Sequence, residues 1–276
     1  MGRREQRVIH RPSRTRSKLK SRSLLALAAL LTIVLVSLIA ANRPTQIEAV
    51  LTGHTDAVRA VAVTEVDGQY VAISGSSDKS VRTWNLRTGE QIGPQINTGH
   101  LASVVGIATA ELDNQTVAIS ASTDHTLDVW NLHTGGQVGS FLRGHTDYVR
   151  AVAATVLDGE QVAVSASDDQ TLRVWNLRTG QQMGSPLATD WSREASAGGV
   201  ATDELGILSV AISGGAEGTL RVWDLHTHQQ LGSPLTGHTS AVTSIATTTL
   251  DGQPIAISGS DDKTLRIWDL AKRAGR

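Results

Sequence analysis

The chain has 276 residues, with 25 Lys or Arg, 26 Asp or Glu and a formal net charge of −1. The first 22 residues hold nine cations and one acid, so the other 254 hold 16 cations and 25 acids, a net charge of −9. This mildly acidic body argues against nucleic acid as the main partner. The chain has no cysteine, which excludes a disulfide scaffold, a thiolate zinc site and a Cys nucleophile.

The chain begins with a basic tail, residues 1–22, which shows no hydrophobic period. Residues 23–42 follow without a charge and contain the run LLALAALLTIVLVSLIAA. A helix of this length measures about 30 Å, the thickness of the hydrocarbon core of a bilayer. The segment 23–42 is therefore expected to be a transmembrane signal-anchor helix.

The charges that flank the apolar segment predict its orientation. Nine cations precede it and only Arg43 follows it closely, so the tail should stay in the cytoplasm and the body should be extracytoplasmic. The chain would then be a single-pass membrane protein. A cleaved signal peptide, which would release a secreted body, and an organelle transit peptide are the alternatives.

The body is repetitive, and five tryptophans mark the repeat. They are spaced by 46, 45, 48 and 45 residues, and each is followed directly by Asn-Leu or Asp-Leu. The five are Trp84, Trp130, Trp175, Trp223 and Trp268. A Gly-His pair lies 30 residues before four of them, with the histidines His54, His100, His145 and His238. A period near 45 residues indicates a repeat architecture.

Each unit is expected to form three short strands and then a fourth. In the first unit, residues 58–66 show an alternating hydrophobic pattern rich in Val and Ala, and Asp67-Gly68 favours a tight turn. Residues 70–74 are nearly all apolar and form the second expected strand. A third strand is expected at 81–86 and a fourth at 91–97. The corresponding strand triplets lie near 57–86, 103–132, 148–177, 196–225 and 241–270.

Gly-His, then about 30 residues, then Trp-Asp or Trp-Asn, five times in register, resembles the WD-repeat (WD-40 repeat) β-propeller family. The resemblance covers residues 47–270, the whole body. It implies an all-β fold, a β-propeller of five four-stranded blades. In this family the first strand of a repeat completes the preceding blade, so the strand at 47–51 is expected to complete the last blade and latch the ring. The repeat count alone does not decide whether five blades close.

The resemblance also implies a structural tetrad in each blade, in which Trp bonds Ser, Ser bonds His, and His bonds an Asp in the turn before the third strand. Four sets are complete: His54, Ser74, Asp78 and Trp84; His100, Ser120, Asp124 and Trp130; His145, Ser165, Asp169 and Trp175; His238, Ser258, Asp262 and Trp268. The fourth unit has Ser213 and Trp223 but carries Glu217 at the Asp position and Ser192-Arg193 at the Gly-His position. Its blade is expected to be the least ordered.

Ser, His and Asp together also suggest a hydrolytic triad. Four copies of one arrangement indicate architecture instead, and the chain has no G-x-S-x-G elbow. We therefore expect no catalytic residues, no enzyme activity and no cofactor. His226 and His228 could bind a metal, but they are expected in a polar turn without a third ligand, so no metal site is predicted.

The resemblance implies that a protein or peptide binds the face bearing the Gly-His and Asp turns. The candidate contact residues there are Arg59, Lys79, Tyr148, Arg150 and Lys263, and their charge would suit an acidic peptide. The leading hypothesis is a non-enzymatic binding scaffold anchored in a membrane. The alternatives are a propeller enzyme or small-ligand sensor that uses the central channel, and an assembly module whose partner in the same complex does the work.

Overall fold

The computed structural model describes residues 49–189 and 198–273. The predicted basic tail (1–22), the predicted anchor helix (23–42) and the Ser192-Arg193 pair lie outside these residues. Within the described residues, no helix has the length and apolar character needed to cross a bilayer.

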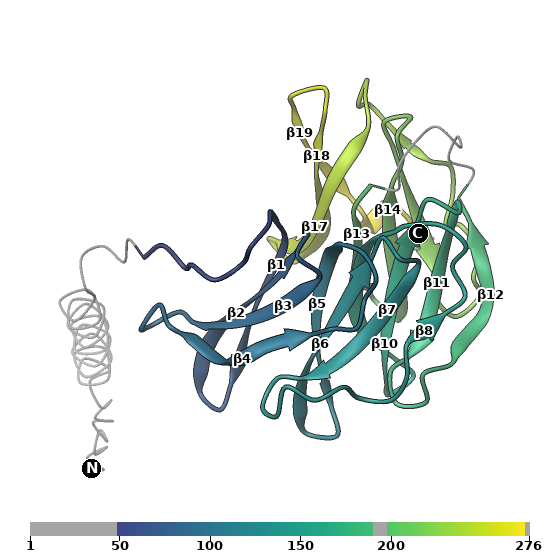
Figure 1. Ribbon diagram of the computed structural model, residues 1–276. Helices are drawn as coiled ribbons and strands as arrows, with labels where there is room; N and C mark the ends of the chain where they lie inside the picture. Colours follow the sequence, from purple (N-terminus) through teal and green to yellow (C-terminus); the bar gives the residue numbers. More distant parts are fainter. Residues whose placement is uncertain (1–48, 190–197, 274–276) are drawn as a thin grey trace, which may run out of the picture. The chain divides into compact units, whose positions relative to one another are not determined.

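The described residues form an all-β fold of five antiparallel sheets, four with four strands and one with three. Each sheet is one blade (Figure 1). Blade 1 contains β1 (Val58–Val66), β2 (Gln69–Ser76), β3 (Ser80–Asn85) and β4 (Gln91–Asn97). Blade 2 contains β5 (Val104–Leu112), β6 (Gln115–Ser122), β7 (Thr126–Asn131) and β8 (Leu142–Arg143).

The remaining blades repeat this order along the chain. Blade 3 contains β9 (Val149–Leu157), β10 (Glu160–Ser167), β11 (Thr171–Asn176) and β12 (Gln182–Ala188). Blade 4 contains β13 (Val200–Leu205), β14 (Leu208–Gly214), β15 (Thr219–Asp224) and β16 (Leu235–Thr236). Blade 5 contains β17 (Val242–Leu250), β18 (Gln253–Ser260) and β19 (Leu265–Asp269), followed by the short 3-10 helix η1 (Ala271–Arg273).

The tight turn between the first two strands sets the register of each blade. In blade 1, Asp67 and Gly68 both have positive φ, 50° and 74°, which a two-residue hairpin of this type requires. Val66 on β1 therefore pairs with Gln69 on β2 directly across the turn, and Ala72 on β2 pairs with Trp84 on β3. The second strand lies in the middle of the sheet, so most of β2 is buried on both faces. The sequence pattern of a nearly continuous apolar run follows from that position.

Neighbouring blades pack through their first strands, since β1 contacts β5, β5 contacts β9, β9 contacts β13, and β13 contacts β17. All five of these strands line one central cavity of about 450 Å³. An apolar cluster fills each of the four interfaces between consecutive blades. In the first interface, for example, Ile73 and Val81 of blade 1 pack with Trp130 of blade 2. In blades 2 to 5, the Trp of the repeat therefore packs in the joint with the preceding blade.

The described part of the expected latch at 47–51 forms no strand, so blade 5 has three strands instead of the four predicted. Residues 49–51 are not in a strand, and β19 has no outer partner among the described residues. The first strands β1 and β17 also lack the close packing that joins the first strands of the other neighbouring blades. Apolar side chains are left exposed on both sides of this gap: Val58 (56%), Val61 (66%), Leu265 (75%) and Ile267 (65%).

Candidate functional site

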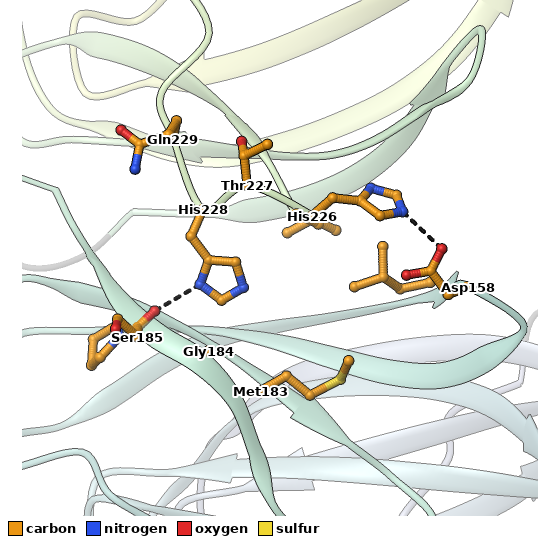
Figure 2. A pocket seen from close by; sticks show the side chains of 11 residues that line it. Asp158, Met183, Gly184, Ser185, His226, Thr227, His228 and Gln229 are labelled. Atoms are coloured by element: carbon orange, nitrogen blue, oxygen red, sulfur yellow. Dashed lines mark hydrogen bonds and ion pairs between the residues drawn. The ribbon is translucent and has the colours of Figure 1, made fainter.

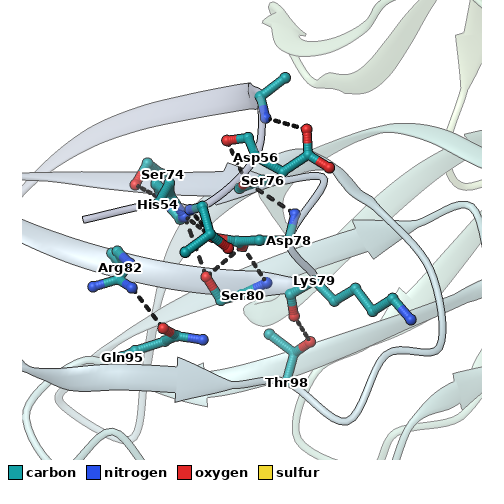
Figure 3. A network of polar contacts seen from close by, with 12 residues as sticks. His54, Asp56, Ser74, Ser76, Asp78, Lys79, Ser80, Arg82, Gln95 and Thr98 are labelled. Carbon is teal, nitrogen blue, oxygen red and sulfur yellow. Dashed lines mark hydrogen bonds and ion pairs between the residues drawn. The ribbon is translucent and has the colours of Figure 1, made fainter. Parts of the chain in front are cut away.

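The residues of the predicted tetrad of blade 1 lie together between the loop before β1 and the strands β2 and β3 (Figure 3). The indole N–H of Trp84 donates to Ser74 Oγ at 2.7 Å. Ser74 Oγ lies 2.7 Å from His54 Nε2, and His54 Nδ1 lies 2.9 Å from Asp78 Oδ2. Since an ionised carboxylate only accepts, Nδ1 carries the imidazole proton and Nε2 accepts from the Ser hydroxyl. Every donor and acceptor of the relay thus has a partner.

The same relay recurs in blades 2, 3 and 5. The distances from the Trp indole nitrogen to Ser Oγ are 3.0, 2.8 and 2.8 Å. Those from His Nε2 to Ser Oγ are 2.9, 2.7 and 2.8 Å, and those from His Nδ1 to the Asp carboxylate are 3.0, 2.7 and 2.7 Å. The residues are His100, Ser120, Asp124 and Trp130; His145, Ser165, Asp169 and Trp175; and His238, Ser258, Asp262 and Trp268.

The relay fixes the charge of its members. Burial acts to raise the pKa of Asp78, but hydrogen bonds from Ser80, Thr55 and His54 outweigh it and hold that pKa well below its usual range. Burial lowers the pKa of His145 although the hydrogen bond to Asp169 opposes this shift. The carboxylates are therefore ionised and His145 is neutral at neutral pH. Because its hydroxyl is hydrogen-bonded to both an indole and an imidazole, each relay Ser has a structural role.

In three of the four Gly-His pairs the glycine packs closely over the Trp and Arg of the third strand, whereas Gly99 has a positive φ of 69°. A Cβ on Gly53 would lie 2.9 Å from a guanidinium nitrogen of Arg82 and 3.2 Å from the ring of Trp84. Gly144 and Gly237 face the same crowding from the Arg and Trp of their own blades. The Gly-His spacing thus reflects a loop pressed onto the third strand.

Blade 4 departs from this pattern within the described residues. Trp223 still donates to Ser213 Oγ at 2.9 Å. Glu217 accepts from Thr219 at 2.9 Å and lies 3.8 Å from Arg221, both in its own blade. Whether this blade is the least ordered stays a prediction, since residues 190–197 lie outside the described part.

Blade 2 holds a buried carboxylate that sequence reasoning did not single out. Asp128 occupies the position two residues before the Trp, where the other blades carry Arg82, Arg173, Arg221 and Arg266. Its Oδ1 accepts from Val129 N and from Gln137 Nε2, while Oδ2 has no partner. Burial raises the pKa of Asp128 to about 6. The substitution of Asp for Arg was visible in the aligned repeats.

The predicted contact residues come from three blades. Tyr148 and Arg150 lie together, with the Arg150 guanidinium 4.9 Å from the centre of the Tyr148 ring. Arg150 also pairs with Asp168 at 2.7 Å, a contact that was not predicted from the sequence. Arg59 on β1 is exposed and donates to Ser77 Oγ at 3.0 Å. Lys79 and Lys263 are exposed in the turns of blades 1 and 5.

Arg59 and Arg150 both line the central cavity, although they come from blades 1 and 3. The rest of the lining is small and mostly apolar, with Gly, Ala, Val and Ile and the hydroxyls of Thr243 and Ser244. Among the described residues that line it, none is an Asp, Glu or His. The cavity therefore offers positive charge and no acid–base pair.

A second cavity, of about 530 Å³, lies between blades 3 and 4 (Figure 2). His226 Nε2 lies 3.0 Å from Asp158 Oδ1, and His228 Nδ1 donates to the carbonyl of Ser185 at 2.8 Å. Both histidines thus have partners in blade 3. Across the described chain, no cluster of three or more His, Asp or Glu is arranged to hold a metal ion.

The His226–Asp158 contact is one of three equivalent bridges between consecutive blades. Asp67 of blade 1 lies 3.0 Å from His133 of blade 2, and Asp113 of blade 2 lies 2.5 Å from Arg178 of blade 3. In each bridge the acid is the first residue of the hairpin turn, and the base lies three residues after the Trp. This pairing was not predicted from the sequence, because its two positions lie in different blades.

Repeated four-stranded antiparallel sheets packed side by side around one cavity define a β-propeller fold. The model of the family described as WD domain, G-beta repeat matches residues 45–85, 136–176 and 229–269. Together with the recurring Trp–Ser–His–Asp relay, these three matched repeats confirm the resemblance to the WD-repeat family seen in the sequence.

Two similar solved structures show the same fold. The structure entitled "Structure of U3-55K" has a TM-score of 0.67 and 21% sequence identity, over 81% of this chain and 64% of that one. "Crystal structure of RRP9 WD40 repeats" has a TM-score of 0.66 and 21% identity, over 81% of this chain and 63% of that one. The chain thus spans less than two thirds of either structure. No curated protein matches it.

Proposed function

We propose that this protein is a non-enzymatic scaffold that binds a protein or peptide on the face bearing the Gly-His and Asp turns. The observation that carries this proposal is the placement of Arg59 and Arg150 at one central cavity whose lining contains no acidic residue among the described ones. Two guanidiniums in a common opening attract an anionic group, and planar guanidiniums bind carboxylates in a bidentate manner.

The neighbourhood of Arg150 supports a contact surface. Tyr148 is 43% exposed, stacks with Arg150 and lies 5.7 Å from the ring of His125. Aromatic and Arg side chains held rigidly at a surface are typical interface anchors. Asp168 orients the Arg150 guanidinium and offsets its positive charge. Arg59 should therefore attract an acidic partner more strongly than Arg150.

The described part of the channel lining carries no acid–base pair, which disfavours the alternative of an enzyme or sensor that uses the channel. A small-ligand site normally combines apolar walls with several convergent polar groups. Among the described residues of this lining, the charged groups are the two guanidiniums. A carboxylate-bearing peptide fits it better than a substrate that needs proton transfer.

The binding proposal is tested with the full chain and two fluorescent peptides of equal length, one rich in Glu and one rich in Lys. We expect only the Glu-rich peptide to bind, with an affinity that falls as salt rises. Arg59→Glu should weaken this binding by at least about tenfold, which is 1.4 kcal/mol. Lys272→Glu, the same charge change near the chain's end, is the control. Equal binding of both peptides, or no effect of Arg59→Glu, would refute the proposed face.

We further propose that the propeller is membrane-anchored through residues 23–42 with the amino terminus in the cytoplasm. The charge asymmetry and the length of the apolar run support this topology. A carboxy-terminal tag should be digested by a protease added outside intact cells. Digestion only after permeabilisation would contradict the orientation, and release of the tagged body into the medium would favour the cleaved signal peptide.

A further inference from the structure

The cavity between blades 3 and 4 contains His226 and His228, a pair to which the proposed function gives no role (Figure 2). Its volume of about 530 Å³ is that of a small-ligand pocket. Leu157 and Leu225, both buried, form part of its wall together with Met183 of β12. The cavity therefore has apolar walls beside two imidazoles, the combination that orients an organic ligand.

His228 occupies a position where the first three blades carry glycine. These glycines, five residues after the Trp, have φ between 70° and 73°: Gly89, Gly135 and Gly180. His228 has φ of 58°, and its N–H donates to the carbonyl of Asp224 at 2.9 Å, the bond that Gly180 makes in blade 3. The turn thus forms without a side chain, and blade 4 keeps an imidazole in a strained conformation. Strain of this kind is characteristic of functional sites.

The imidazole of His228 lies against blade 3, where it becomes a hydrogen-bond acceptor. A Cβ on Gly184 would overlap the ring, so this glycine leaves the space that the ring occupies. His228 Nδ1 lies 2.8 Å from the carbonyl oxygen of Ser185. Because a carbonyl only accepts, Nδ1 carries the proton, and Nε2 of the neutral ring is an acceptor. Among the described residues, Nε2 has no hydrogen-bond partner.

Asp158 supplies a second acceptor on the opposite wall. Its Oδ1 accepts from Nε2 of His226 at 3.0 Å, while its Oδ2 has no partner in the described part of the chain. In Figure 2, Asp158 Oδ2 and His228 Nε2 face each other across the cavity, with the side chain of Met183 beneath them. An anion and a neutral acceptor above an apolar floor require a ligand that has a positive charge, several donors and an apolar stem.

We propose that this cavity binds an arginine side chain of an extended peptide. The guanidinium bridges Asp158 and His228, its aliphatic stem packs on Met183, and the adjoining peptide residue covers Pro186 at the exposed rim. A guanidinium presents its donors as a planar fork that reaches both walls. A lysine ammonium is a compact, strongly hydrated point charge, so a Lys-rich peptide is not a ligand of this cavity. The site is separate from the central cavity and does not depend on Arg59.

The proposal is tested by fluorescence anisotropy with the full chain and three labelled peptides that differ only at one central residue: arginine, lysine or citrulline. Citrulline keeps the shape of arginine and lacks its charge. We expect the arginine peptide to bind at least about tenfold more tightly than the other two, because only it offers a charged planar fork. Arg59→Glu should leave this binding unchanged, which separates the result from that of the acidic-peptide test.

Asp158→Asn removes the anion of the cavity and should weaken binding of the arginine peptide by at least about tenfold. Asp251→Asn, the same change at the first hairpin-turn residue of blade 5, is the matched control and should have no effect. Equal affinities for the three peptides, no binding of the arginine peptide, or equal effects of the two variants would overturn the proposal.

His228→Gly separates a role in binding from a role in stability, since it restores the glycine of the other blades. We expect it to weaken binding of the arginine peptide by about fivefold through loss of one acceptor. The melting temperature should stay unchanged or rise, because glycine accepts the positive φ. A lower melting temperature together with unchanged binding would show that His228 fastens blade 4 to blade 3 and contacts no ligand.

Discussion

At the scale of single residues, the relay serine is expected to contribute strongly to stability. Ser74 Oγ accepts from the indole of Trp84 and donates to His54, so its loss leaves one buried donor and one buried acceptor without partners. Each unsatisfied buried group costs about 1–3 kcal/mol. The serine therefore has a structural role: it accepts one hydrogen bond and donates another.

Ser74→Ala is expected to lower the free energy of unfolding by about 2–4 kcal/mol, because both orphaned groups stay buried. Denaturant-induced unfolding of the full chain measures this change. Ser233→Ala, in an exposed loop of blade 4, is the matched control and should leave stability unchanged. A similar loss in both variants, or in neither, would show that the relay carries no special share of the stability.

Asp128 should give the protein an unusual dependence on pH. Burial raises its folded-state pKa to about 6, above the value near 4 of an unfolded Asp. A raised pKa favours folding below the unfolded value, and this benefit is lost as the pH rises toward 6. At neutral pH, the ionised and half-satisfied carboxylate should therefore cost about 2–3 kcal/mol.

Asp128→Asn removes this charge and keeps the side chain's shape. We expect the variant to become more stable than the unmodified chain as the pH rises from 4 to 7. Melting curves recorded across that pH range measure this difference. Glu65→Gln, which removes an exposed carboxylate, should show no such trend. A pH-independent difference for Asp128→Asn would mean that the carboxyl does not titrate in this range.

At the scale of the elements, the turn before each third strand has one conformation and different residues. Lys79, His125, Gln170 and Lys263 all have φ between 67° and 75°, and blade 4 has Gly218 at 78°. A side chain in this left-handed region costs about 1–2 kcal/mol. The bulky residues at these tips are therefore retained against a conformational penalty, and Lys79 and Lys263 lie on the proposed contact face.

Glycine and lysine at this turn should have opposite effects in two blades. Lys263→Gly is expected to stabilise the protein by up to about 1 kcal/mol, since glycine accepts positive φ. Gly218→Lys should destabilise it by more, because its Cβ would lie 2.6 Å from the carbonyl of His238. Unfolding free energies of both variants measure the pair. A loss of stability with Lys263→Gly would show that the lysine makes contacts that offset its strain.

At the scale of the whole propeller, the repeat units could be read from the sequence because their signals are local. Asp-Gly turns, the apolar second strand and the spacing from His to Trp each depend on one blade and its adjoining loop. The joints between blades were harder to foresee. The bridge from Asp67 to His133 links residues 66 positions apart, and its logic emerges only when two blades are placed side by side.

Closure could not be predicted from the repeats, because it depends on how a small rotation accumulates from joint to joint. The latch expected at 47–51 followed from counting strands, and the count does not contain the angle between blades. Asp128 shows a different limit, since a departure from a repeated Arg reveals a special position without revealing its chemistry. A buried, half-satisfied carboxylate became visible only with its surroundings.

The four relays should determine which blades open locally under native conditions. Each one ties the loop before a blade to that blade's second and third strands, so every blade except blade 4 has its own complete fastening. Repeat proteins open in local units under native conditions. In heavy water, the indole N–H groups of Trp84, Trp130, Trp175 and Trp268 should therefore exchange slowly. The indole N–H of Trp223, which lacks the complete relay, should exchange first.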